Sequence, residues 1–306
     1  MPVSSRVYVV LTVIQLFFAT LPVAVKIALR DLSSPSVAFL RVTGAALLFL
    51  VLHATLVRER LHSRRDLGRL AVYALFGVVL NQLLYITALN WTTATAAQTL
   101  QTVGPAMTLL IALLLGRERS TPAKWMGIGV AGCGALYLVG IGVSMGSGLG
   151  NLLVLLNVTA FSIYLVISRD LVRRYHPLTV ITWIFLFGSI GIAPWGIPSL
   201  LAERGALSGS TVAAMVWMIL VPTVTGYYLN VWALQRVQAS AVAIFVYLQP
   251  VLTALIAIPL LGERPSPRLI PAGALIFAGV AASMWAERRA RSVGIPSPAD
   301  QEHTEP

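Results

Sequence analysis

The sequence predicts an all-α membrane protein with ten transmembrane helices, arranged as two inverted repeats of five helices each. Three observations predict this fold: long apolar runs without charge, basic residues concentrated in alternate connecting segments, and an internal repeat. Of the 306 residues, 57% are hydrophobic and 11% are charged, whereas soluble domains carry about 25% charged residues. Lipid must therefore solvate much of this chain.

Five stretches of the sequence contain no Asp, Glu, Lys or Arg. They are Leu70–Gly116, Trp125–Ser168, Tyr175–Ala202, Gly205–Gln235 and Val237–Gly262. A spanning helix needs about 20 apolar residues, and turn-forming residues at 90–93 and 144–148 divide the first two stretches. The ten predicted spans are residues 7–28, 36–56, 69–89, 94–115, 124–143, 150–169, 178–198, 210–231, 239–261 and 268–286.

The basic residues are distributed unevenly between the two sides of the membrane. With the N-terminus in the cytoplasm, sixteen Lys and Arg side chains fall on the inner side and four on the outer side. This is the positive-inside bias, and it places both termini in the cytoplasm. The net charge of +11 is thereby explained by topology, so we expect anionic membrane lipids as partners and no nucleic acid.

The two halves of the sequence align with each other. A shift of 145 residues places Pro105 on Pro250, and Glu118-Arg119 on Glu263-Arg264. Near the start of each half, a shift of 142 places Gln15 on Asn157. Residues 7–143 and 150–287 are therefore predicted as two five-helix repeats, followed by a disordered cytoplasmic tail at 288–306. Five is an odd number, so the second repeat is inverted, which is typical of secondary transporters.

Two stretches resemble a known family. They run from Gly104-Pro105 through Leu115-Gly116-Arg117-Glu118-Arg119 to Pro122 and Gly127, and from Gln249-Pro250 through Leu260-Leu261-Gly262-Glu263-Arg264 to Pro267 and Gly273. A Pro in the penultimate helix, followed by a Gly-Glu-Arg-like turn, resembles the repeated domain of the EamA family in the drug/metabolite transporter superfamily. The resemblance covers roughly residues 8–287. It implies a central cavity lined by helices 1–4 and 6–9, peripheral helices 5 and 10, and export of amino acids or related metabolites.

Polar side chains within spans indicate the candidate cavity, because burying them without partners is costly. Gln15 and Lys26 share one face of span 1, and Gln98, Thr102 and Pro105 share one face of span 4. For each side chain the alternative is a hydrogen bond that only joins neighbouring helices. The substrate-cavity candidates are Gln15, Lys26, Arg41, Asn81, Tyr85, Gln98, Thr102, Asn157, Tyr164, Tyr228, Asn230 and Tyr247, with Gln82 and Tyr227 beside them.

Two cations lie within predicted spans, and two interpretations of them stay open. Lys26 and Arg41 either extend to the outer interface or attract a carboxylate of the substrate, unless Asp31 pairs with one of them. No acid lies in the core of any span, although proton-coupled carriers commonly use one. Coupling therefore needs another group, or the protein is a facilitator.

Proline and glycine residues indicate where helices bend or approach closely. Pro105 and Pro250 each remove a backbone N–H, so we expect helix hinges there. The glycines of spans 5 and 10 are suited to close helix contact, either within one chain or in a homodimer. These glycines are Gly127, Gly129, Gly132, Gly134, Gly273 and Gly279.

The sequence therefore favours a secondary transporter that exports amino acids or related small metabolites by alternating access. The alternative on the same scaffold is a flippase for a lipid or a lipid-linked sugar. An enzyme is not expected, because no Ser–His pair or metal-ligand spacing lies at membrane depth, and no catalytic residue, metal or cofactor is assigned. The expected location is the bacterial cytoplasmic membrane, with a small-molecule substrate as the partner.

Overall fold

The computed structural model describes residues 5–117, 122–139, 145–203, 205–229, 245, 248–264 and 267–292. Within these residues the chain forms helices and turns and no strands, as the sequence predicts. The α-helices are α1 (Ser5–Ala28), α2 (Ser34–Leu52), α3 (Arg64–Ala74), α4 (Asn81–Ala88), α5 (Ala94–Gln101), α6 (Gly104–Leu114), α7 (Pro122–Val139), α8 (Met145–Arg174), α9 (Pro177–Ala202), α10 (Gly209–Met218), α13 (Gln249–Leu261) and α14 (Leu269–Ser292). Three π-helical segments continue them, namely η1 (His53–Val57), η2 (Leu75–Leu80) and η3 (Ile219–Thr225).

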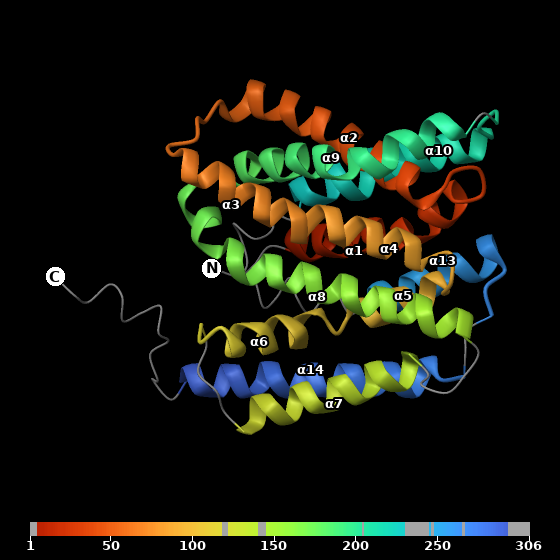
Figure 1. Cartoon of the computed structure of the whole chain (residues 1–306). Helices are drawn as coiled ribbons and strands as arrows, with labels where there is room; N and C mark the ends of the chain where they lie inside the picture. The colour runs from red at the N-terminus through yellow and green to blue at the C-terminus, as the bar shows by residue number, and fades with distance from the viewer. Residues whose placement is uncertain are drawn as a thin grey trace.

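The helices run side by side between two ends of the molecule (Figure 1). At the right-hand end, which we call the Glu263 end, the backbone N–H of Ser33 donates to Glu203 Oε1 at 2.7 Å. At the left-hand end, which we call the Asp66 end, the hydroxyl of Tyr175 donates to Asp66 Oδ2 at 2.7 Å. Connecting segments that are far apart in sequence are therefore joined at each end.

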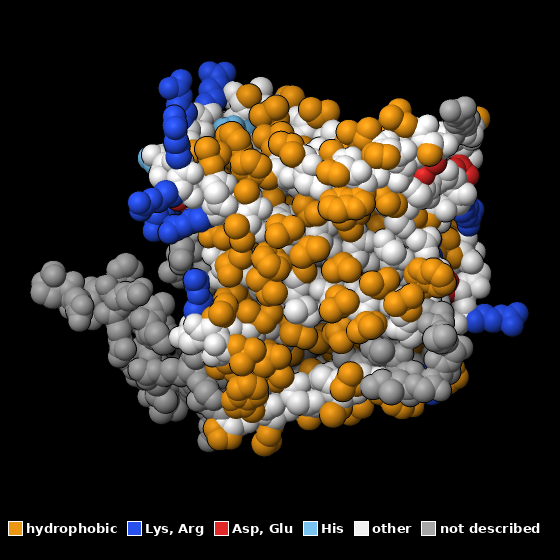
Figure 2. All heavy atoms as spheres, in the orientation of Figure 1, with side chains coloured by type: hydrophobic (Ala, Val, Ile, Leu, Met, Phe, Trp, Pro, Cys, Tyr) orange, Lys and Arg blue, Asp and Glu red, His pale blue; other side chains and the backbone are white. Residues whose placement is uncertain are grey.

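Apolar side chains cover the face between the two ends, and the Lys and Arg side chains visible on this face lie at the ends (Figure 2). In the described part of the chain, seven helices are long and apolar enough to cross a membrane: 9–28, 34–57, 64–88, 94–114, 148–168, 177–202 and 209–229. Three shorter apolar helices are also present, at 125–134, 249–261 and 269–279. The sequence prediction of an all-α membrane protein is confirmed, whereas ten full spans stay a prediction.

Several helix ends differ from those that the sequence predicts. α8 continues to Arg174, beyond the predicted end at residue 169, and α14 continues to Ser292, so residues 288–292 of the predicted tail are helical. Both extensions end in arginine-rich sequence, and positive charge stabilises the C-terminal end of a helix. Hydropathy locates only the apolar part of such a helix. Residues 293–306 lie outside the described residues.

The main core lies among α2, α3, α4, α8 and α9. Phe49, Leu70, Ile86, Leu171 and Ile192 are at most 2% exposed there. The interior also buries an unusual number of polar side chains, which form the candidate site described below.

α7 and α14 form a closely packed pair along one edge of the bundle (Figure 1), where the family resemblance places helices 5 and 10. A Cβ atom on Gly134 would lie 2.8 Å from the carbonyl oxygen of Ala272, and one on Gly279 would clash with the backbone of Ala131. Gly134 and Gly279 therefore make their close helix contact within the chain. A Cβ on Gly129 or Gly132 would meet nothing within 4 Å.

Substituting Gly279 tests this pairing. Gly279→Leu is expected to destabilise the protein by about 1–3 kcal/mol, the usual cost of overpacking, because the side chain would meet the α7 backbone. Thermal unfolding in detergent measures the effect. Gly129→Leu is the matched control, and a melting temperature lowered equally by both changes would contradict the assignment.

Candidate functional site

A chain of four buried polar side chains joins helices from the two halves of the sequence. Gln249 Nε2 donates to Gln15 Oε1 at 2.6 Å, and Gln98 Nε2 donates to Gln249 Oε1. The hydroxyl of Tyr85 donates to Gln98 Oε1 at 3.3 Å. All four residues are at most 8% exposed. These hydrogen bonds therefore connect α1, α13, α5 and α4 inside the bundle.

Arg41 of α2 makes a second set of buried contacts. Its Nη1 donates to Gln82 Oε1 at 2.5 Å, while Nε and Nη2 both donate to Thr223 Oγ1 at 3.2 Å. Gln82 Nε2 in turn donates to Asn81 Oδ1 at 3.2 Å. Arg41 is 4% exposed, so protein encloses its side chain. The guanidinium ties α2 to α4 and η3.

Asn157 of α8 connects these contacts to α5. Its Nδ2 donates to the backbone oxygen of Asn81 at 2.6 Å, and its Oδ1 accepts a hydrogen bond from Gln101 Nε2 at 2.8 Å. Asn157 is fully buried. Side chains from both halves of the sequence thus form a polar interior, which apolar helix faces separate from lipid.

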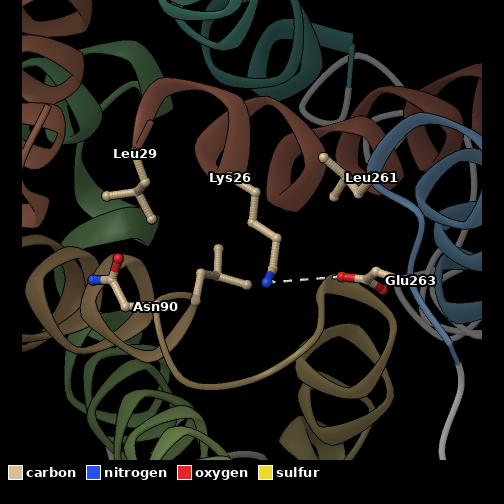
Figure 3. A pocket seen from close by; sticks show the side chains of 6 residues that line it. Lys26, Leu29, Asn90, Leu261 and Glu263 are labelled. Atoms are coloured by element: carbon tan, nitrogen blue, oxygen red, sulfur yellow. Dashed lines mark ion pairs between the residues drawn. The ribbon is translucent and has the colours of Figure 1, made fainter. Parts of the chain in front are cut away.

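The Glu263 end carries a depression of about 280 Å³ above this interior. It is lined by Lys26, Leu29, Leu89, Asn90, Leu261 and Glu263. The Nζ of Lys26 points toward Glu263 and lies 3.8 Å from its Oε1 (Figure 3). The two side chains are 23% and 6% exposed. Lys26 therefore has an acidic partner, and this partner is Glu263 rather than Asp31.

Glu263 also caps the start of α5. Its Oε1 accepts a hydrogen bond from the N–H of Ala94 at 2.5 Å, and its Oε2 accepts from the N–H and the hydroxyl of Thr95 at 3.2 and 3.0 Å. The first N–H groups of a helix have no partner within the helix and carry partial positive charge. A carboxylate from the second half of the sequence therefore stabilises a helix of the first half.

Each of the two prolines lies in the first turn of a helix. α5 ends at Gln101, and α6 begins at Gly104 with Pro105 in its first turn. α13 begins at Gln249 with Pro250 in its first turn. A proline is favourable at that position because its missing N–H would have no helical partner. Span 4 is thus divided at Thr102–Val103, close to Pro105, where the sequence predicts a hinge.

A family comparison accounts for these paired features. The EamA-like transporter family matches the sequence twice, over residues 6–140 and 148–285. The chain belongs to this family.

Known proteins similar to this EamA-like chain are also transporters. An uncharacterized transporter of Archaeoglobus fulgidus is 27% identical over 289 residues, covering 90% of this chain and 96% of the relative. A probable terminal-alkyne amino-acid exporter of Streptantibioticus cattleyicolor is 25% identical, covering 92% of this chain and 93% of the relative. A crystal structure with a TM-score of 0.63 and 20% identity covers 93% of this chain and 99% of that chain, which shows the fold alone. The protein is a multi-pass integral membrane protein.

Most of the cavity candidates named from sequence come together in this EamA-like fold. The polar interior contains Gln15, Arg41, Asn81, Tyr85, Gln98 and Asn157, and Lys26 lies above it at the Glu263 end. Asn230 and Tyr247 lie outside the described residues.

Three candidates make other contacts or none of these hydrogen bonds. The hydroxyl of Thr102 donates to the backbone oxygen of Thr99 at 2.6 Å and so satisfies its own helix near the break. Tyr164 packs against Gly77, where an added Cβ would lie 2.7 Å from its ring. Tyr228 is 60% exposed. The neighbouring Tyr227 turns inward instead, because successive helical residues point about 100° apart.

Sequence reasoning missed Gln249, Gln101, Thr223 and Glu263. Gln249 precedes Pro250 in the family motif, and Glu263 belongs to the Gly-Glu-Arg turn. The family motif therefore contains both residues, but from sequence alone it indicates hinge and turn elements only. Gln101 and Thr223 have no repeated polar counterpart, since a 145-residue shift places both of them opposite valines.

Removing Gln249 tests the polar chain. Gln249→Leu leaves the amides of Gln15 and Gln98 without their partner, and each lost interhelical bond is worth about 0.6 kcal/mol. We expect a lower melting temperature in detergent than for wild type. Val251→Leu, a change at a 58% exposed position of the same helix, should leave it unchanged. A Gln249→Leu protein as stable as wild type would show that these hydrogen bonds do not hold the two halves of the protein together.

Proposed function

We propose that this protein is a secondary transporter that exports amino acids or related small metabolites across the cytoplasmic membrane. Transport proceeds by alternating access between two inverted five-helix repeats. The observation that carries the proposal is the buried polar chain from Gln15 through Gln249 and Gln98 to Tyr85, because it crosses between the two halves. Substrate sites of inverted-repeat transporters lie at such a junction.

Equivalent irregularities in the two halves support the repeat. Shifted by 145 residues, η2 falls on residues 220–225, which lie within η3. The same shift places the start of α6 at Gly104 on the start of α13 at Gln249. Helix starts thus fall at corresponding positions, and discontinuous helices are a feature of transporter binding sites. We propose Pro105 and Pro250 as hinges at these helix starts.

The charge distribution supports the orientation. The Arg-rich segment 58–69 begins α3 at the Asp66 end, and α14 ends on the same side (Figure 1). Because positive residues favour the cytoplasmic side, the Asp66 end faces the cytoplasm and the Glu263 end faces outward. The seven long spans and three shorter apolar helices then make up ten crossings.

The relatives favour a metabolite exporter over the flippase alternative. They are named as transporters, and one of them as a probable amino-acid exporter. The absence of acids from the span cores gives no support to a carboxylate proton carrier within the membrane. The expected substrate is therefore a small polar metabolite that crosses through the polar interior.

Flux measurements test the function. Purified protein in proteoliposomes should release one or more of the preloaded, radiolabelled L-amino acids faster than protein-free vesicles do. A panel of sugars and nucleosides serves for comparison. No flux of any amino acid, sugar or nucleoside would overturn the proposal, and flux of phospholipid alone would favour the flippase.

Glu263 is expected to hold the outer end closed, since it joins the second half to α5 and Lys26 of the first half. Glu263→Gln removes the charge from this contact, so the outward-open state should become more populated. With Cys133→Ser and Leu29→Cys as the background, labelling from outside by an impermeant maleimide should accelerate about fivefold, the effect of about 1 kcal/mol.

Arg264→Gln is the matched control for the outer closure, because Arg264 is exposed next to Glu263. It should leave the labelling rate at Leu29→Cys unchanged. Equal rates in Glu263→Gln and wild type would refute a role for Glu263 in closure.

A further inference from the structure

Arg41 is a cation held deep within the bundle. It lies seven residues after Ser34, the first residue of α2, which corresponds to about 10 Å along the helix axis at 1.5 Å per residue. Lys26 lies two residues from the end of α1, beside the depression at the Glu263 end. The two cations therefore lie at different depths, with Arg41 the deeper and the more buried.

The charge of Arg41 has no acidic partner among the described residues. Arg41 belongs to neither the Lys26–Glu263 nor the Arg69–Asp66 ion pair. The sequence itself has no acid within residues 70–116, 125–168 or 205–262. A cation buried in this way is costly unless an anion accompanies it. Such residues in transporters indicate a substrate path.

The hydrogen bonds of the guanidinium leave N–H donors with which it could bind an anion. Its three contacts with Gln82 and Thr223 use three of the five N–H donors that an arginine offers. Both acceptors are neutral, and the Thr223 hydroxyl is already committed as a donor to the backbone oxygen of Met218 at 2.7 Å. A carboxylate is a stronger acceptor than an amide or a hydroxyl, and it matches the planar fork of arginine.

The partners of Arg41 lie at the two irregular helix segments. Gln82 lies two residues after the end of η2, and Thr223 lies within η3. π-Helical segments occur frequently at functional sites, and these two occupy equivalent positions in the two halves. A ligand that displaced Gln82 and Thr223 would contact one irregular segment from each half, which is the arrangement that alternating access requires.

Aromatic residues lie close to the partners of Arg41. Tyr85 follows Gln82 by three residues and Tyr227 follows Thr223 by four, which is about one helical turn in each case. The ring of Tyr227 packs edge-on against Phe18, Phe49 and Phe185, with centroids 6.2, 6.4 and 6.0 Å apart. Apolar walls keep water out and strengthen an ionic contact.

We infer that Arg41 binds the carboxylate of a mono-anionic or zwitterionic substrate, and that it selects carboxylate-bearing metabolites over their neutral analogues. A single guanidinium balances one negative charge, whereas a phosphate brings nearly two at neutral pH. The inference rests on the proposed function and deepens it, because it names the substrate class of the same site. Lys26, already paired with Glu263, is not the residue that selects the carboxylate.

The test compares each transported amino acid with its primary amide, which lacks the negative charge. Wild-type proteoliposomes should transport the acid at least about tenfold faster than the amide at limiting concentration. Arg41→Gln keeps hydrogen-bonding capacity without charge, so it should lower flux of the acid by about tenfold or more and leave flux of the amide nearly unchanged. Arg41→Lys keeps the charge without the fork, so it should retain part of the preference.

Arg30→Gln is the matched control, because Arg30 is exposed at the Glu263 end, and it should alter neither flux. Equal loss of acid and amide flux in Arg41→Gln would overturn the inference, since Arg41 would then only hold α2, α4 and η3 together. Equal transport of acid and amide by wild type would also overturn it while leaving the proposed function intact. An absence of flux for every compound would instead overturn the proposed function together with the inference.

A binding measurement keeps the inference testable if a variant transports nothing. The transported amino acid should raise the melting temperature of detergent-solubilised wild type and of Arg41→Lys, but not that of Arg41→Gln. Its amide should raise none of them. A shift of the same size in wild type and Arg41→Gln would contradict carboxylate binding at Arg41.

Discussion

The fold depends on one constraint: a polar group inside a bilayer must find its partner within the protein. This chain buries glutamine, asparagine and threonine side chains on several helices. The bilayer core contains no water that could bind them. Gln249 accepts from Gln98 and donates to Gln15, so one amide joins helices from both halves. The same groups that hold the helices together also form the polar interior that we propose as the solute path.

The two membrane cations satisfy this constraint in different ways. Lys26 has Glu263, which reaches the helices from a connecting segment and also caps α5. Arg41 has only neutral acceptors among the described residues. We propose that the first cation is part of an outer closure, whereas the second has no acidic partner in the part of the chain that the structure describes. On this difference rests our proposal that Arg41 recognises the substrate.

The fold was largely predictable from three signals. Hydropathy reports on burial in lipid, the charge bias on orientation in the membrane, and the internal repeat on the relation between the two halves. The family followed from the two Pro and Gly-Glu-Arg motifs. Pro105 indicated a hinge in span 4 but not the extent of the break, since Thr102 and Val103 do not interrupt the apolar pattern. The partner of Lys26 was missed because Glu263 lies outside any span, and only the folded structure brings that turn back against α1 and α5.

The candidate site was predictable by residue type rather than by partner. Gln15, Arg41, Gln98 and Asn157 were identified because buried polar groups are rare in lipid-facing sequence. The rotation of a helix about its axis decides which of two neighbours, such as Tyr227 and Tyr228, faces the interior. A single sequence does not fix this rotation. The choice of Tyr228 over Tyr227 shows this limit.

The central claim, two equivalent bundles inserted in opposite orientations, is tested most directly by the sidedness of two equivalent turns. In a Cys133→Ser background, Arg119→Cys and Arg264→Cys are labelled separately with a membrane-impermeant maleimide. The account predicts that Arg264→Cys reacts in intact cells and that Arg119→Cys reacts only after the membrane is permeabilised. Reaction of both positions from the same side would contradict it.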